Sequence, residues 1–220
     1  MQRYLKTLRL AGVLLLGMLL PAVSFAGIRA DRNVNIQAFY TFFLGSGAVI
    51  SYNLGDHLSF GINYYSAIYE GDGEATENDE IVKVEFATSE FFLRIFPFEG
   101  SGLYVSGAAV MRDWSITASG YSTDFEGTGY ATDYKFVAEW PNSGVAYGLG
   151  GNWTTDIGLS WGLFLGVLTG DDPKIKGTVS NSSISQADID KGIENFEEEE
   201  NFGERYNTAP LMRVSFGYAF

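Results

Sequence analysis

The chain has 220 residues, including 27 glycines and 5 prolines, and 15% of its residues are aromatic, a mixture that disfavours helices and is typical of strands that pack closely or bend. Its formal net charge of −13 excludes the nucleic-acid-binding proteins, because phosphate binding needs a basic patch that this chain lacks. The absence of cysteine excludes a disulfide framework and leaves a transition-metal site without thiolate ligands.

The first 26 residues have the three parts of a secretory signal peptide. Three cations precede an apolar core from Leu10 to Leu20, and Ser24 to Ala26 fits a small-x-small cleavage site. A membrane anchor, the alternative, needs about 20 apolar residues, and this core has eleven. We therefore expect a signal peptide over residues 1–26 and one mature domain over residues 27–220. Removal of the three cations would change the net charge from −13 to −16.

Three alternating stretches follow the leader. Val34 to Leu44, Ala48 to Leu54 and Leu58 to Tyr69 alternate between apolar residues and small or polar ones, which is the period-two pattern of strands with two unlike faces. The short sequences "GSG" and "GDH" between them predict two tight turns. The next connection, residues 70–80, is long and acidic.

The fourth stretch, from Ile81 to Phe96, alternates in two different phases. Near the end of the stretch the apolar residues, such as Phe91 and Leu93, are at odd-numbered positions and alternate with Glu90 and Arg94. Near its start the apolar residues, beginning with Val82, are at even-numbered positions. Two phases in one strand imply either a bulge near residues 87–89 or an upper half that has left a membrane.

The rest of the chain predicts four more strands. Leu103 to Ser119 follows the turn "PFEGSG", and Gly144 to Thr154 and Ile157 to Thr169 form a hairpin with glycines on most of one face. The polar connection over residues 120–142 offers an additional strand in "YKFVAEW", and the longest connection, residues 170–206, leads to the last strand. That strand alternates up to its aromatic last residue in "LMRVSFGYAF".

The eight strands indicate a barrel in a membrane. Short turns lie at one end of the array with both termini, and the long loops lie at the other. An apolar outer face and about ten residues per strand are what a transmembrane barrel requires, because lipid leaves an open sheet edge unsatisfied. A soluble barrel, the alternative, would carry frequent charges on its polar face, whereas this face carries glycine, serine and asparagine. We expect an all-β, eight-stranded antiparallel up-and-down transmembrane β-barrel.

Two segments carry a resemblance to a known group. The leader "AGVLLLGMLLPAVSFA" and the ending "MRVSFGYAF" resemble those of the small eight-stranded outer-membrane proteins of Gram-negative bacteria, the group with the OmpA barrel and the OmpX-like and OmpW-like proteins. The resemblance implies an outer-membrane location, contact with lipid and lipopolysaccharide, and insertion by the barrel-assembly machinery. The ending would be the assembly signal that this machinery reads, formed by Met212, Val214, Phe216, Tyr218 and Phe220.

The inward face predicts a polar lumen. Eight strands leave an interior just wide enough for side chains to fill, and a charge in a narrow lumen needs a partner. Three arginines with one glutamate predict a charge-assisted network of Glu90, Arg94, Arg112 and Arg213. The network either plugs the barrel or lines a narrow, gated pore. The candidate lumen residues are Asn35, Gln37, Asn63, Glu90, Arg94, Ser106, Arg112, Asn152 and Arg213.

The only histidine, His57, does not indicate an enzyme. Outer-membrane enzymes of this general shape place a histidine at the outward-facing rim, where it serves as a base. His57 lies in the "GDH" turn, at the end expected to face the periplasm. We therefore expect no catalytic residue, no cofactor and no metal centre. The functions that remain are a structural or surface-interaction protein of the envelope, then a small porin-like channel for minor solutes or apolar molecules, and last a rim-located lipid- or peptide-modifying enzyme.

The predicted outer loops are strongly acidic. Residues 70–80 contain six acids and no base, and residues 170–206 contain ten acids and four bases. Such loops can simply keep a surface solvated. They can also bind a cationic partner, or collect divalent cations shared with lipopolysaccharide phosphates, because hard cations prefer oxygen ligands. Any such site would be diffuse and would include Glu197, Glu198, Glu199 and Glu200.

Overall fold

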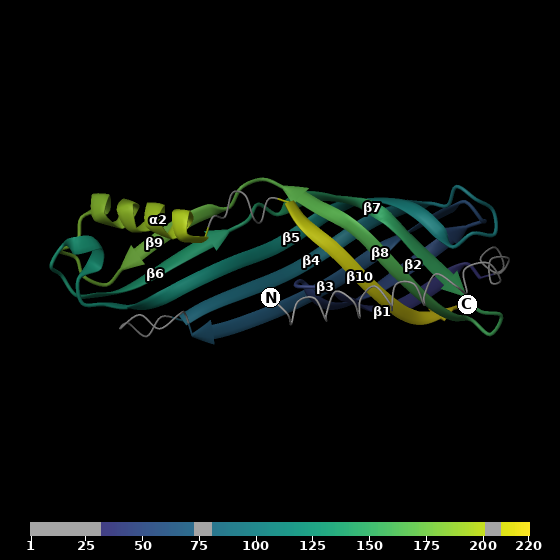
Figure 1. Ribbon diagram of the computed structural model, residues 1–220, viewed down its shortest axis with the longest axis horizontal. Helices are drawn as coiled ribbons and strands as arrows, with labels where there is room; N and C mark the ends of the chain where they lie inside the picture. Colours follow the sequence, from purple (N-terminus) through teal and green to yellow (C-terminus); the bar gives the residue numbers. More distant parts are fainter. Residues whose placement is uncertain (1–31, 73–80, 201–207) are drawn as a thin grey trace, which may run out of the picture.

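A computed structural model describes residues 32–72, 81–200 and 208–220 (Figure 1). The expected signal peptide, residues 1–26, and most of the acidic 70–80 connection lie outside the described residues. The described residues form ten strands, one α-helix and one short 3-10 turn. Their bounds are β1 Val34–Thr41, β2 Gly45–Leu54, β3 Leu58–Asp72, β4 Ile81–Ile95, β5 Leu103–Ser122, η2 Phe125–Gly127, β6 Thr132–Glu139, β7 Ser143–Thr154, β8 Leu159–Gly170, β9 Lys174–Val179, α2 Gln186–Glu200 and β10 Thr208–Ala219.

Eight of the strands close into an antiparallel barrel. Around it they follow the order β1, β2, β3, β4, β5, β7, β8 and β10, and β10 pairs with β1 again. Asn35 lies opposite Ala219 and Thr41 opposite Arg213 where the first and last strands meet. Every backbone edge of the barrel therefore has a partner, as a bilayer requires. The predicted eight-stranded antiparallel barrel is confirmed.

The short turns lie at one end of the barrel together with the C-terminus (Figure 1). The exposed His57 accepts or donates a hydrogen bond at 2.9 Å with the backbone oxygen of Phe96, which begins the next short turn. At the same end, the backbone N–H of Ala219 donates to the oxygen of Gly158 at 2.8 Å. The predicted grouping of the short turns and the chain end is thus seen in the structure.

Beyond the other end of the barrel, three strands continue into a folded extension. Residues 103–111 of β5 pair with β7, but residues 115–122 pair instead with β6, which pairs with β9. The upper ends of β3, β4 and β5, together with β6, β9, η2 and α2, are called the extension below (Figure 1). The additional strand expected in "YKFVAEW" is therefore present as β6.

The structure corrects the prediction that residues 170–206 are one long connection, because β9 and α2 lie within it. Ser185 caps α2: its Oγ accepts the Asp188 N–H at 3.3 Å, and the Asp188 carboxylate accepts the Ser185 backbone N–H at 3.2 Å, a reciprocal capping box. Ile189, Ile193 and Phe196 form the apolar face of the helix and pack on the core of the extension. In the described part of the chain, no helix is long and apolar enough to cross a membrane.

Strand β4 contains no bulge, although its two phases suggested one. Its pairing with β3 and with β5 is continuous from Ile81 to Ile95. The strand instead keeps one inward face, which carries Glu90 and Arg94 in the barrel and Val84 and Phe86 in the extension. The polarity of the two faces changes along the strand. The register therefore agrees with the second interpretation, in which the two phases arise because the upper half of the strand has left a membrane.

The first hairpin turn also lies elsewhere than predicted. The turn occupies residues 42–44, and the "GSG" residues belong to β2. Phe43 adopts a positive φ of 68° at the turn. Leu44, which the alternation of Val34 to Leu44 would place on the apolar outer face, is 4% exposed. An added Cβ on Gly47 would clash with the backbone of Tyr64 and Tyr65 on β3, so Gly47 serves close strand packing.

Candidate functional site

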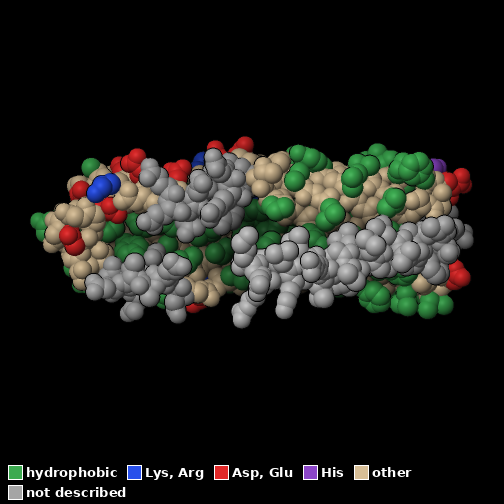
Figure 2. All heavy atoms as spheres, in the orientation of Figure 1, with side chains coloured by type: hydrophobic (Ala, Val, Ile, Leu, Met, Phe, Trp, Pro, Cys, Tyr) green, Lys and Arg blue, Asp and Glu red, His purple; other side chains and the backbone are tan. Residues whose placement is uncertain are grey.

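The outside of the barrel is an apolar band. Figure 2 shows hydrophobic side chains over the barrel, with acidic side chains at its short-turn end and over the extension. On the extension, the outward residues of β4 include Lys83 and Glu85, which form a surface ion pair with 3.0 Å between Nζ and Oε1. The two faces thus exchange polarity where the barrel ends. Exposed apolar residues of the band include Ile36, Ile50, Ile62, Phe91, Leu93, Val105, Leu149, Leu165 and Phe216.

All nine candidate lumen residues are buried, between 1% and 8% exposed. Those nearest the short turns form a neutral polar cluster. The Gln37 side-chain N–H group donates at 2.9 Å to both Asn152 Oδ1 and Ser160 Oγ, and the Ser160 hydroxyl donates to Asn35 Oδ1 at 3.0 Å. Strands β1, β7 and β8 are thereby joined inside the barrel, so this part of the lumen is occupied by protein groups.

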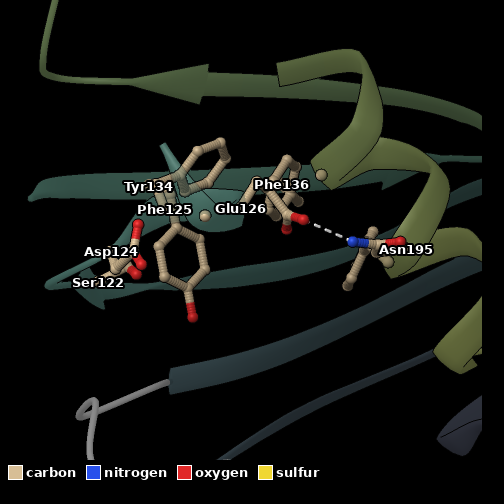
Figure 3. A pocket seen from close by; sticks show the side chains of 10 residues that line it. Ser122, Asp124, Phe125, Glu126, Tyr134, Phe136 and Asn195 are labelled. Carbon is tan, nitrogen blue, oxygen red and sulfur yellow. Dashed lines mark hydrogen bonds between the residues drawn. The ribbon is translucent and has the colours of Figure 1, made fainter. Parts of the chain in front are cut away.

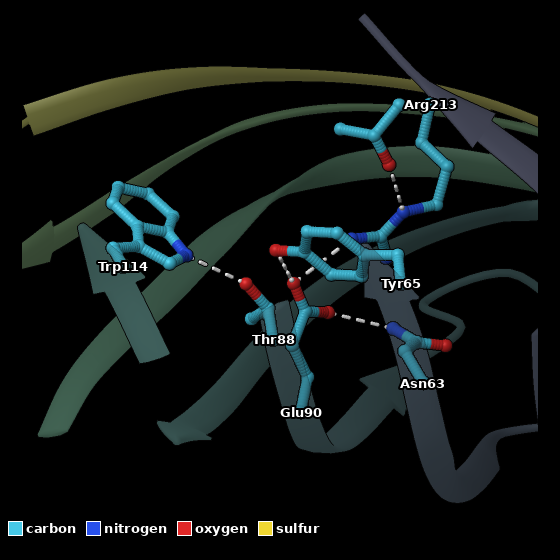
Figure 4. Close-up of polar contacts among 7 residues, drawn as sticks. Asn63, Tyr65, Thr88, Glu90, Trp114 and Arg213 are labelled. Carbon is cyan, nitrogen blue, oxygen red and sulfur yellow. Dashed lines mark hydrogen bonds and ion pairs between the residues drawn. The ribbon is translucent and has the colours of Figure 1, made fainter. Parts of the chain in front are cut away.

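In the middle of the lumen, Glu90 and Arg213 form an ion pair across the barrel (Figure 4). Arg213 Nη2 donates to Glu90 Oε1 at 2.9 Å, and the two strands that carry them, β10 and β4, are on opposite sides of the barrel. Tyr65 donates to the same oxygen at 2.7 Å, and Asn63 donates to Glu90 Oε2 at 2.6 Å. Arg213 Nε donates to Thr41 Oγ1 at 3.3 Å, so both charges are hydrogen-bonded as well as paired, as burial demands.

Aromatic rings surround the Arg213 guanidinium. Its central carbon lies 4.5 Å from the ring centroid of Phe39, 5.3 Å from that of Tyr65 and 5.5 Å from that of Phe164. Rings at these distances attract a cation and exclude water from it. Three rings and a carboxylate thus surround one guanidinium at this level of the lumen.

The structure separates the other two arginines from this pair, contrary to the single network that the sequence suggested. Arg94 stacks on the rings of Phe92 and Tyr104, at 4.1 Å and 4.8 Å. In the part of the chain that the structure describes, no carboxylate lies within ion-pair distance of Arg94. Its position four residues from Glu90 on one strand face brings it near the pair, but its guanidinium is held by rings.

Arg112 lies where the extension separates from the barrel. It donates from Nε to the backbone oxygen of Pro141 at 3.0 Å and from Nη2 to that of Asp171 at 2.9 Å. Pro141 precedes β7 and Asp171 follows β8, so one side chain ties β5 to both neighbouring connections. Arg112 therefore joins the barrel to the extension and does not contact Glu90.

The inward glycines of β7 and β8 are covered by aromatic rings. An added Cβ on Gly150 would lie 2.4 Å from the ring of Tyr104, and one on Gly148 or Gly166 would lie 2.9 or 2.7 Å from the ring of Phe164. Phe164 and Tyr104 stack with centroids 6.4 Å apart. The bare glycine face therefore gives space to these rings.

The remaining predicted site residues lie outside the lumen. The side chains of the expected assembly signal, from Met212 to Phe220, point outward in alternation, and Phe216 and Phe220 are 61% and 62% exposed. Glu197 is exposed near the end of α2, whereas the side chains of Glu198, Glu199 and Glu200 lie outside the described residues. Among the described side chains, no group of three His, Asp or Glu is placed to hold a metal ion.

The sequence reading did not identify a pocket of about 470 Å³ on the extension (Figure 3). It lies between η2, β6 and α2, and its floor contains the buried rings of Phe125 and Phe136. Its rim carries Ser122, Asp124 and Asn195. The signal for it was the aromatic content of residues 125–136 combined with the amphipathic pattern of α2, in two segments predicted to be long connections, the first of them with an additional strand in "YKFVAEW".

Two kinds of comparison found no similar protein: no protein-family model matches the chain, and no curated protein matches its sequence. Among solved structures, Acinetobacter baumannii CarO2 has a TM-score of 0.57 at 13% identity, covering 86% of this chain and 99% of that chain. CarO of the same organism has a TM-score of 0.54 at 11% identity, with 87% and 99% covered. A major outer membrane protein from Thermus thermophilus has a TM-score of 0.44 at 11% identity, with 85% and 99% covered. The likeness to the two Acinetobacter proteins is one of fold, and this chain has the architecture of the small outer-membrane barrels.

Proposed function

We propose that the chain is a non-enzymatic protein of the bacterial outer membrane, whose filled barrel anchors the extension at the cell surface for interaction with a ligand or partner. The observation that carries this proposal is the ion pair between Glu90 and Arg213, which crosses the lumen between opposite strands. A barrel closed in this way leaves its function to the part that projects from it. The folded extension, with its pocket, is that part.

The location is supported by the outside of the barrel and by the leader. The apolar band and the closed sheet suit a bilayer, and the expected signal peptide over residues 1–26 would direct export. The acidic residues at both ends of the band suit water on either side. Lipid and lipopolysaccharide would contact the band, and the barrel-assembly machinery would insert the chain.

The three rings around Arg213 and the rings over the inward glycines argue against a pore function, because they occupy space that a pore would need. The position of His57 argues against a rim enzyme, because it lies in the short turn between β2 and β3 and contacts Phe96 of the next short turn. The structural and surface-interaction role fits both observations.

Surface display can be tested with single cysteines, because the natural chain has none. Glu194→Cys places a thiol on the exposed side of α2, and Asp156→Cys places one in an exposed short turn. A membrane-impermeant maleimide added to intact cells should label Glu194→Cys, and should label Asp156→Cys only after the outer membrane is permeabilised. The reverse pattern would place the extension in the periplasm and refute the proposal.

A further inference from the structure

The pocket on the extension has an aromatic floor that a helix closes. Phe125 and Phe136 stack with ring centroids 6.3 Å apart and are 3% and 6% exposed. Gly192 of α2 lies against both rings, since an added Cβ would lie 2.9 Å from Phe136 Cζ and 3.0 Å from Phe125 Cζ. The volume of about 470 Å³ is within the range of small-molecule sites. The pocket therefore suits one small ligand.

The rim of the pocket offers both hydrogen-bond donors and acceptors. Ser122 and Tyr134 contribute hydroxyl groups, Asn195 an amide and Asp124 a carboxylate. Asp124 Oδ1 accepts the Gly129 N–H at 2.7 Å, and no contact within the described residues engages its Oδ2. A ligand with several hydroxyl groups, each able to donate and accept, would match this mixture.

The deepest carboxylate of the pocket already faces a cation. Asn195 Nδ2 donates to Glu126 Oε2 at 2.6 Å (Figure 3). Lys191 Nζ lies 3.6 Å from the same oxygen. The Glu126 side chain is 20% exposed. An incoming ammonium group would compete with Lys191 for this oxygen, whereas a neutral ligand would leave the arrangement intact.

The backbone at Glu126 is held in an uncommon conformation. Its φ is 51°, a left-handed value that a glutamate rarely adopts and that costs free energy. Lys191 of α2 donates to the Glu126 backbone oxygen at 3.1 Å and so helps to hold it. Such strain is found mainly where a side chain must be placed for function, and here it places the carboxylate at the edge of the pocket.

The geometry points to a binding site for a neutral hexopyranose in this pocket, a ligand class that rests on the proposed surface-interaction role. The hydroxyl edge of the sugar meets Asp124, Ser122 and Asn195. Its apolar C–H face meets the half-buried rings of Tyr134 and Phe196. Aromatic rings suit such a face because the C–H hydrogens are electropositive and the ring faces electronegative. The sugar is either free or the terminal unit of a glycan.

Binding is measured by calorimetry on the refolded full chain in dodecylphosphocholine, a detergent without a sugar head group. The probes are glucose, galactose and mannose, each free and as its methyl glycoside, with putrescine as the cationic comparison. At least one sugar should bind with millimolar affinity, as expected for so small a ligand. Asp124→Asn, which keeps the acceptor for Gly129, should weaken binding about tenfold, because it removes a charged acceptor. Asp156→Asn, a matched change in a distant turn, should have no effect.

Equal binding of a sugar and its methyl glycoside indicates a terminal glycan unit, because such a unit is substituted at C1, and binding of the free sugar alone indicates a monosaccharide. Either result supports the site. The inference is overturned if no sugar binds up to about 100 mM, if putrescine binds and the sugars do not, or if both variants weaken binding equally. These results leave barrel closure and surface location unaffected, because those are read from conductance and from labelling of cells.

Discussion

Arg213 and Glu90 are 123 residues apart in sequence, and their side chains meet at 2.9 Å in the middle of the barrel. They come from strands on opposite sides, and their side chains are 6% and 2% exposed. One contact thus joins the last strand of the chain to the fourth across the lumen. The stability of the barrel and the closure of its lumen should both depend on this pair.

Glu90→Ala should destabilise the protein by about 3–5 kcal/mol, because it leaves the Arg213 cation buried without its carboxylate. The matched control is Glu85→Ala on the same strand. Glu85 pairs with Lys83 at 3.0 Å, but both side chains are 41% exposed, so its loss should cost at most about 1 kcal/mol. Urea unfolding in lipid vesicles measures both variants. Equal free energies of unfolding for the two variants would show that the Glu90–Arg213 pair does not stabilise the barrel as predicted.

A charge added to the outer face of β5 should destabilise the protein in the barrel but be tolerated in the extension. Val105, 50% exposed, lies in the apolar band, and Val105→Arg should destabilise the folded barrel by about 2–4 kcal/mol when lipid surrounds it. Thr117→Arg changes the same face of the same strand beyond the change of polarity, so it should be tolerated. Folding yields in lipid vesicles give the comparison, and a similar loss in both variants would place the membrane boundary elsewhere.

Arg112→Met should loosen the extension while leaving the barrel folded. It removes the hydrogen bonds to the Pro141 and Asp171 oxygens and keeps most of the buried side-chain volume. Limited trypsin digestion should then cut faster at Lys174 or Lys176 of β9, with the heat-modifiable mobility of the barrel unchanged on gels. Unchanged digestion would mean that Arg112 does not hold the two parts together.

Ser185→Ala should fray the start of α2. The change removes the acceptor of the Asp188 N–H and the hydroxyl that donates to the Asp188 carboxylate, and loss of such a cap costs about 1 kcal/mol. Amide exchange should rise in residues 186–190 and stay constant in β6. Ser182→Ala, an exposed serine three residues upstream, is the control, and a similar rise in that variant would exclude the cap as the cause.

Changing Tyr218 and Phe220 together to Ser should block membrane insertion. Both side chains point outward, their rings lie 5.0 Å apart, and the Phe220 N–H donates to the Val34 oxygen at 2.8 Å where the barrel closes. If they are part of the assembly signal, the variant should be exported and then degraded in the periplasm. Its level in purified outer membranes measures this, and a normal level would remove the role from these residues.

The barrel could be predicted from the sequence because its signal is local. Alternation at period two identifies both the strands and the inward residues, and all nine candidate lumen residues proved to be buried. The partner of Glu90 could not be predicted in this way, because contacts across a lumen depend on the stagger of all eight strands. Arg94, four residues away on the same face, was therefore grouped with it, although it stacks on Phe92 and Tyr104.

Apart from β6, the extension was not predicted from the sequence, for a different reason. Its strands continue those of the barrel with the polarity of their faces exchanged, so a single pattern did not cover β4 from end to end. The helix α2 did leave a signal, in Ser185 and Asp188 at capping spacing and in the spacing of Ile189, Ile193 and Phe196. The many acids in residues 170–206 hid that signal under the composition of a loop.

Conductance in planar bilayers tests the central claim most directly, because a lumen closed by Glu90, Arg213 and the rings of Phe39, Tyr65 and Phe164 should pass no ions. The refolded full chain is inserted, its incorporation is verified by recovery of folded protein from the membrane, and the current is recorded under an applied voltage. The account predicts no steady unitary current. Steady channels of one size, seen in every membrane that contains the folded protein, would contradict it and would make the chain a pore.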